Sequence, residues 1–162
     1  MYPQQAGAGG KWSTINEIKD PLVIRQQGDL SCGIACGQML LQDRQINIDP
    51  DRIEQLTGTP ISCQALAMAL NTLDSSPSRL WEGGPLKLPG ATNTELIKVL
   101  NSTDSWCAML WETGATIGHF IIIDGFDSSS NLMIRDPWDA TRYQMAIDDF
   151  INYWTTEAIF AR

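Results

Sequence analysis

Histidine is almost absent from this sequence of 162 residues, which contains only His119. Any chemistry that needs an imidazole base or a histidine ligand must therefore use this one side chain. A lone histidine is more often structural than catalytic, so His119 gains meaning only in combination with other residues. Its place at the start of the apolar stretch 118–126 predicts that it lies at the end of a β-strand.

Positive charge is also scarce. Lys and Arg number 11 against 19 Asp and Glu, which gives a net charge of −8. The chain has no basic run of the kind that contacts phosphates, so we expect no nucleic-acid partner. The four cysteines show neither a disulfide framework nor the paired spacing of a zinc site. We therefore expect a reduced compartment, no metal and no other cofactor.

Long hydrophobic runs are missing as well. The longest strongly apolar run is 120–123, far too short for a membrane span, so we expect no membrane insertion. The N-terminus has neither the charged start nor the apolar core of a secretory signal peptide. The location expected from this is the cytoplasm, or a target cell reached through a dedicated secretion system. Residues 1–14, which include Gly9-Gly10, are expected to form a flexible lead-in or linker before one domain at 15–162.

The patterning of the domain changes from helical to β-like along the chain. The first part predicts helices, the stretch 74–90 a surface excursion, and the second part mostly strands. This order indicates the α+β class. Helices are expected at 32–42, 50–56, 62–73, 92–100 and 147–154, and strands at 106–111, 118–126, 132–135, 143–145 and 158–161.

One cysteine stands where a helix should begin. Ser31 is a suitable cap for the predicted helix and Cys32 lies in its first turn, a position that favours thiolate character. Gln26, six residues earlier, has an amide that can donate to an oxyanion formed when a thiolate attacks a carbonyl. Cys36 falls on the same helical face, and we interpret it as a buried packing residue. The stretch 26–36 therefore indicates thiol-mediated acyl transfer.

A second candidate pair lies in the β-rich part. Asp136 ends the predicted strand that follows the one begun by His119, and Pro137 comes directly after it. Strand register could place the two side chains side by side, so that the carboxylate fixes the imidazole tautomer. Alone, the Asp-Pro pair is only a turn signal.

Taken together, Gln26, Cys32-Gly33-x-Ala35, Gly118-His119-Phe120 and Asp136-Pro137 resemble the papain-like cysteine proteases. Within that clan they most resemble the bacteriocin-processing peptidases that cut after double-glycine leaders. The resemblance extends from about residue 22 to 155. It implies a papain-like fold in which an N-terminal helical part, with the cysteine at a helix N-terminus, packs on a C-terminal antiparallel sheet.

The resemblance also implies roles for four residues. Cys32 would be the nucleophile, and His119 would pair with its thiolate and then protonate the leaving amine. Asp136 would orient His119, and the Gln26 side chain with the Cys32 N–H would form the oxyanion hole. The implied activity is endopeptidase cleavage of a protein or peptide through an acyl-thioester, after small residues such as Gly-Gly.

The biological setting stays open between two alternatives. Exporter-linked family members continue into membrane segments and an ATPase, which this sequence lacks. Papain-fold domains also occur as toxin modules of bacterial polymorphic toxins, and we favour this toxin or effector setting over leader-peptide processing. A cognate immunity protein is then a candidate partner.

Two other functions are alternatives to the peptidase, a transglutaminase-like or deamidase activity and a non-catalytic binding module. The Gln26 spacing favours the protease over the first, and the complete set of four site residues disfavours the second.

Overall fold

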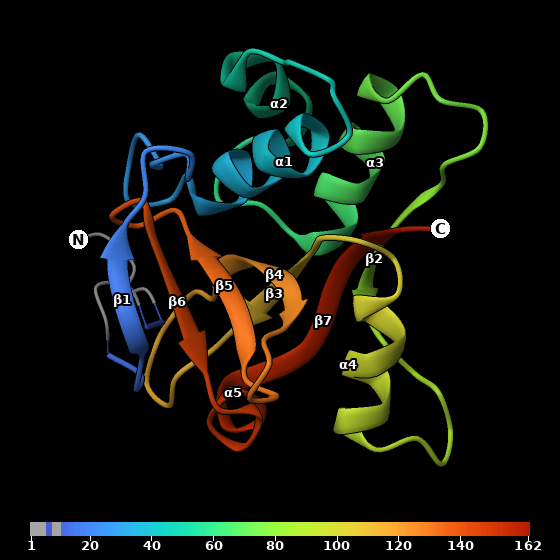
Figure 1. Cartoon of the computed structure of the whole chain (residues 1–162). Coiled ribbons are helices and arrows are strands. Elements are labelled where there is room, and N and C mark those ends of the chain that lie inside the picture. The colour runs from blue at the N-terminus through green and yellow to red at the C-terminus, as the bar shows by residue number, and fades with distance from the viewer. Residues whose placement is uncertain (1–5, 8–10) are drawn as a thin grey trace.

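In the described part of the chain, an antiparallel sheet of seven strands forms the centre of the molecule (Figure 1). The structure is a computed structural model that describes residues 6–7 and 11–162. The sheet order is β1-β6-β5-β4-β3-β7-β2, and each neighbouring pair is antiparallel. The strands are β1 (Ile15–Lys19), β2 (Trp81–Pro85), β3 (Trp106–Leu110), β4 (His119–Phe126), β5 (Leu132–Asp136), β6 (Thr141–Met145) and β7 (Trp154–Ala161).

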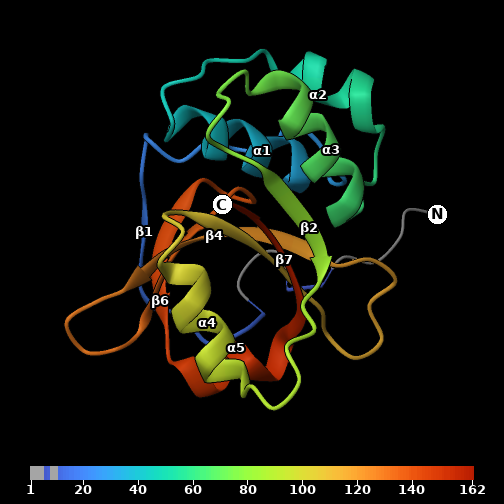
Figure 2. The same ribbon diagram turned by 90° about the vertical axis from the view of Figure 1, so that its right-hand side faces the viewer.

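Within residues 6–7 and 11–162, five helices cover the two faces of this sheet. Three of them lie together over one face, and the other two lie on the opposite side (Figure 2). None of the helices in the described ranges is long and apolar enough to cross a membrane. The first group is α1 (Cys32–Gln42), α2 (Pro50–Thr57) and α3 (Cys63–Leu73), and the second is α4 (Asn93–Asn101) and α5 (Ile147–Tyr153).

Because helices cover both faces, the central strands are apolar on both sides. Successive residues of β4 alternate between two cores: Phe120 and Ile122 pack with α1 and α3, whereas Ile121 and Ile123 pack with α4 and α5. This alternation follows from the two-residue repeat of a strand. The mixed helix and antiparallel-sheet architecture confirms the predicted α+β class, and the predicted helices and central strands are all present.

Both edge strands were missed by the sequence analysis. β2 falls in the stretch that was predicted to be a surface excursion, yet the Trp81 side chain is only 2% exposed. The Asn71 side chain holds the Trp81 backbone with two hydrogen bonds of 2.8 and 2.9 Å, and the Trp81 indole donates to Asp74 at 2.9 Å. The pairing with β7 comes from residues distant in sequence, and the local pattern Trp-Glu-Gly-Gly-Pro carried no strand signal of its own.

The stretch predicted to be a flexible lead-in also contains a buried residue. Trp12 is 2% exposed and its indole donates to the Tyr143 hydroxyl at 3.0 Å. Ala6 is fully buried as well, and its N–H donates to the Ile117 carbonyl at 3.0 Å. The expectation that this stretch has little to bury therefore fails at Trp12 and Ala6. The rest of that prediction, including the Gly9-Gly10 pair, lies mostly outside the described residues.

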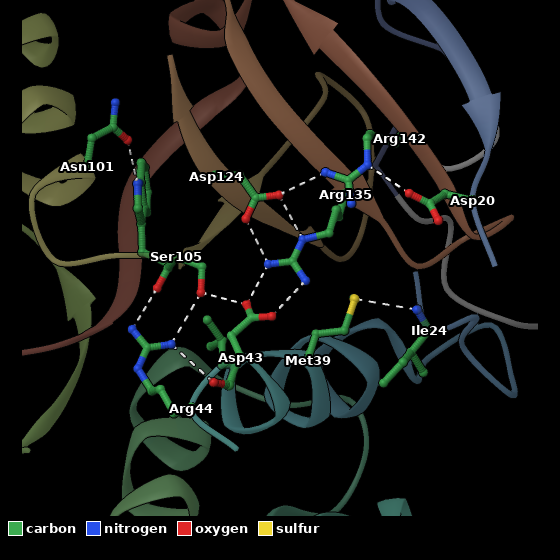
Figure 3. Close-up of polar contacts among 12 residues, drawn as sticks. Asp20, Ile24, Met39, Asp43, Arg44, Asn101, Ser105, Asp124, Arg135 and Arg142 are labelled. Carbon is green, nitrogen blue, oxygen red and sulfur yellow. Dashed lines mark hydrogen bonds and ion pairs between the residues drawn. The ribbon is translucent and has the colours of Figure 1, made fainter. Parts of the chain in front are cut away.

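A network of charged side chains joins the C-terminal end of α1 to the sheet (Figure 3). Arg135 of β5 donates to Asp43, the residue that caps α1, at 2.6 and 3.2 Å. The same guanidinium donates to Asp124 of β4 at 2.8 Å through two nitrogens. Burial lowers the pKa of Arg135, but the two carboxylates outweigh this effect and raise it above its usual value. This Arg135 network holds the helix in one place relative to the strands.

We predict that Arg135→Met destabilises the fold, because it leaves Asp43 and Asp124 without their shared cation. The free energy of unfolding should fall by about 3 kcal/mol, measured by urea denaturation. Arg25→Met is the matched control, since Arg25 forms a 3.7 Å pair with Asp139 and its side chain is 68% exposed. The control should change the free energy by no more than about 0.5 kcal/mol. Equal effects of the two substitutions would contradict an anchoring role for Arg135.

Candidate active site

The N-terminal end of α1 carries Cys32, which is only 5% exposed. Cys32 is the first residue of the helix and Ser31 occupies the N-cap position, as predicted. The Ser31 side chain makes no capping hydrogen bond within the described part of the chain. The first-turn N–H groups of α1 therefore keep their positive partial charge for another group. Gly33 follows, and a side chain there would press on Phe120 and Ile61 at 3.2–3.3 Å, so its absence lets α1 approach the sheet closely.

His119 and Asp136 meet on the sheet. The pairing of Ile123 with Ile134 places His119 and Asp136 on one face of neighbouring strands as diagonal neighbours. His119 Nε2 lies 2.7 Å from an Asp136 carboxylate oxygen, and the imidazole is fully buried. The strand register therefore places the two side chains in contact, which was the condition for the predicted pair.

The surroundings of this pair favour its charged form. Burial lowers the pKa of His119, but the Asp136 carboxylate and then the Cys32 thiol outweigh burial and hold the pKa well above its usual value. Burial raises the pKa of Asp136, whereas His119, the Trp138 N–H and the Tyr143 hydroxyl together lower it. The site therefore supports an imidazolium beside a carboxylate.

The second ring nitrogen of His119 remains open on the side of the cysteine. The Cys32 thiol is close enough to the ring to contribute to its raised pKa. No hydrogen bond of standard geometry joins the two, because Nδ1 is buried and has no hydrogen-bond partner among residues 6–7 and 11–162. With Nε2 occupied by Asp136, Nδ1 is the atom that can exchange a proton with a thiol or a leaving group.

Gln26 is held between the two halves of the site. Its backbone N–H donates to the Pro137 carbonyl at 2.8 Å, which ties it to the residue after Asp136. Its side chain is buried, and Nε2 donates to the Gly28 carbonyl at 2.7 Å. An amide nitrogen carries two hydrogens, so one donor remains available. Gln26 and Ser31 also line one hollow of about 270 Å³, which places the glutamine next to the start of α1.

An apolar groove of about 220 Å³ opens beside Cys32. Gly118 lies in its wall, and a side chain there would overlap Met109. This groove is lined by Leu30, Cys32, Gly33, Pro60, Ile61, Ser62, Met109, Trp111, Ile117, Gly118 and Phe120. A separate and larger hollow of about 810 Å³ adjoins the Arg135 network and includes none of the four predicted site residues.

Several residues of the site had escaped the sequence analysis. Tyr143 and the Trp138 N–H both donate to Asp136, at 2.8 and 3.0 Å, and Trp12 donates in turn to Tyr143. The alternation of buried side chains along β6 could have indicated that Tyr143 is buried. The pairing of β6 with β5, which brings Tyr143 to Asp136, is not encoded in the local sequence.

The remaining cysteines belong to the same core cluster as Cys32. Cys36, Cys63 and Cys107 are fully buried, and burial raises the pKa of Cys63 and Cys107. Cys36 packs in the core between the helices and the sheet. Within the described ranges, no three His, Cys, Asp or Glu side chains gather where they could hold a metal ion.

Known proteins with the same features were found by both sequence and structure. A protein named cysteine protease effector 1, from Escherichia coli O1:K1:H7, is 34% identical over 157 residues. The aligned part covers 96% of this chain but only 30% of that protein.

Two solved structures share the fold. The peptidase domain of Streptococcus ComA, described as a bifunctional ABC transporter of a quorum-sensing pathway, matches with a TM-score of 0.69 and 17% identity, over 85% of this chain and 95% of that one. The peptidase domain of Streptococcus mutans ComA matches with a TM-score of 0.56 and 15% identity, over 86% and 98%.

The sequence model of the Peptidase C39 family matches residues 21–162. This range contains Cys32, His119, Asp136 and Gln26, and the fold around them is that of the ComA peptidase domains. The papain-like resemblance expected from the motifs is therefore confirmed. This chain belongs to the Peptidase C39 family of cysteine peptidases.

Proposed function

We propose that Cys32, His119, Asp136 and Gln26 form the catalytic site of this cysteine peptidase. The observation that carries the proposal is the buried His119, which is bonded to Asp136 through Nε2 and leaves Nδ1 without a hydrogen-bond partner among the described residues. Such an imidazole is oriented on one side and open on the other, as a proton carrier between thiol and substrate must be.

The reaction follows from this arrangement. The Cys32 Sγ, as thiolate, forms a bond to the scissile carbonyl carbon, and the resulting oxyanion accepts hydrogen bonds from Gln26 Nε2 and the Cys32 N–H. His119 gives its Nδ1 proton to the leaving amine, the C–N bond breaks, and an acyl-thioester remains. His119 then takes a proton from water, which attacks the thioester and releases the acid and Cys32.

We further propose that the substrate is a protein cut after small residues such as Gly-Gly, and that the domain acts as a bacterial effector. The first part is what the family resemblance implies. Support for the second is the relative named cysteine protease effector 1, of which this chain covers 30%. Delivery by a secretion system and a cognate immunity protein that covers the cleft belong to this effector proposal. Leader-peptide processing is the alternative. The similarity to the ComA peptidase domain, at 17% identity, supports the fold alone.

We expect new protein N-termini when the wild-type chain is incubated with a bacterial proteome and the products are mapped by mass spectrometry. Cys32→Ala should produce none of them, because it removes the nucleophile. Glutamine-to-glutamate conversion without new termini would instead indicate a deamidase. If neither the wild type nor Cys32→Ala produced new termini or this conversion, a binding module would be indicated.

His119→Ala should reduce thiol-dependent turnover about a thousandfold or more, because the sequence contains no second histidine to replace it. Cys36→Ser is the matched control: it changes a buried thiol in the same helix and should keep most of the activity per folded molecule. The measurement is kcat/KM on a peptide taken from the mapped cleavage site. Substantial activity of His119→Ala would show that another group acts as the base.

Gln26→Ala should lower kcat by about a hundredfold with little change in KM, because the amide stabilises the transition state more than the bound substrate. Gln27→Ala is the control, since Gln27 is adjacent but exposed. Steady-state kinetics on the same peptide separate the two constants. A purely KM-based effect would argue that Gln26 binds the substrate and does not contribute to the oxyanion hole.

A further inference from the structure

A chain of hydrogen bonds continues from the proposed triad across the sheet. His119, Asp136 and Tyr143 lie on one face of three adjacent strands, β4, β5 and β6, each a diagonal neighbour of the next. Tyr143 donates its hydroxyl proton to the Asp136 oxygen Oδ2 at 2.8 Å. Trp12, from the segment before β1, donates its indole N–H to the Tyr143 oxygen at 3.0 Å.

Both oxygens of the Asp136 carboxylate are occupied by this arrangement. Oδ1 accepts from the Trp138 N–H at 3.0 Å and pairs with His119 Nε2 at 2.7 Å, while Oδ2 accepts from Tyr143. The carboxylate cannot turn about its Cβ–Cγ bond without losing a partner, and Asp136 is only 5% exposed. A buried charge left short of one donor is costly, so the Tyr143 hydroxyl helps keep Asp136 ionised.

Trp12 determines which way the hydroxyl proton of Tyr143 points. Because the indole N–H can only donate, the tyrosine oxygen accepts from it, and the tyrosine proton is directed to Asp136. The Trp12 ring also lies beside the His119 ring, with centroids 6.0 Å apart. The Ala6 N–H bonds to the Ile117 carbonyl, two residues before His119, so the described part of this N-terminal segment reaches the start of β4.

We propose that Tyr143 is a positioning residue of the peptidase site, acting through Asp136, and that Trp12 acts through Tyr143. The proposal rests on the proposed function, because it assigns Asp136 the task of orienting His119. It makes Trp12, which precedes β1, part of the arrangement that positions His119. Both residues are buried, Trp12 at 2% and Tyr143 at 1% exposure, so both should affect turnover and its pH dependence more than substrate binding.

The expected signature is a shift of the acid limb of the pH profile. Tyr143 is one of the groups that lower the pKa of Asp136, so Tyr143→Phe should let Asp136 take up a proton at higher pH. Once protonated, Asp136 no longer holds the imidazolium, and activity is lost. The acid limb should therefore move upward by about one pH unit. At neutral pH, kcat should be about tenfold lower for a different reason, the loss of the hydrogen bond that fixes the orientation of the carboxylate, with KM within about twofold.

The test measures kcat/KM and, separately, the rate of Cys32 alkylation by iodoacetamide against pH, with the alkylated residue identified by mass spectrometry. The alkylation profile needs no substrate. Tyr153→Phe is the matched control: its ring also packs on Trp12, with centroids 5.6 Å apart, but its hydroxyl forms no hydrogen bond to a described residue. The control should leave both profiles unchanged. Melting temperatures are recorded for every variant.

Trp12→Phe should shift both profiles in the same direction as Tyr143→Phe but by less, and should add nothing in the Tyr143→Phe background. Additive effects would overturn the action of Trp12 through Tyr143. If Tyr143→Phe does not fold, Trp12→Phe alone decides, and an unmoved acid limb overturns the proposal. If Tyr143→Phe folds and its acid limb does not move, while Cys32 of the wild type is alkylated faster than an ordinary thiol, the positioning role alone is overturned. A wild-type Cys32 that reacts like an ordinary thiol overturns the proposed function and this role together.

Discussion

The site depends on how closely α1 is held against the sheet, because its two halves come from different layers. At the N-terminal end of the helix, the missing side chain of Gly33 allows close approach to Phe120, which is adjacent to His119. At the other end, Asp43 is bound by Arg135 of the sheet. The helix is thus fixed at both ends, and the position of Cys32 relative to the imidazole follows from packing far from the sulfur as much as from packing near it.

The sheet places a buried ion pair where burial alone would oppose one. Burial by itself lowers the pKa of His119 and raises the pKa of Asp136, since removing charge from water is unfavourable. Each is kept charged by the other and by donors on neighbouring strands. This mutual dependence explains why the site needs a central region of the sheet, where β4, β5 and β6 are paired on both sides and solvent does not compete for the carboxylate.

The local sequence was sufficient for the elements that carry their own signals. The helices α2, α3 and α4 form where they were expected, and each begins after a side chain that accepts a hydrogen bond from its first turn: Asp49, Ser62 and Thr92. β1 and β2 could not be predicted in the same way, because their stability comes from pairing with β6 and β7.

The same distinction holds within the site. The spacing of Gln26 and Cys32 is local and was readable, and the motifs pointed to His119 and Asp136. The contact between His119 and Asp136 depends on strand register, and the donors Tyr143 and Trp12 depend on tertiary packing. A single sequence contains no direct record of either.

The position of Trp12 bears on where this domain physically begins. The family match starts at residue 21, after β1 and after the tryptophan that reaches the site. Two boundaries therefore exist: one marks the stretch that the family model matches, and the other marks the stretch that builds the fold. A fusion or transplant designed on the first boundary would carry all four motif residues and still omit a strand and a buried indole.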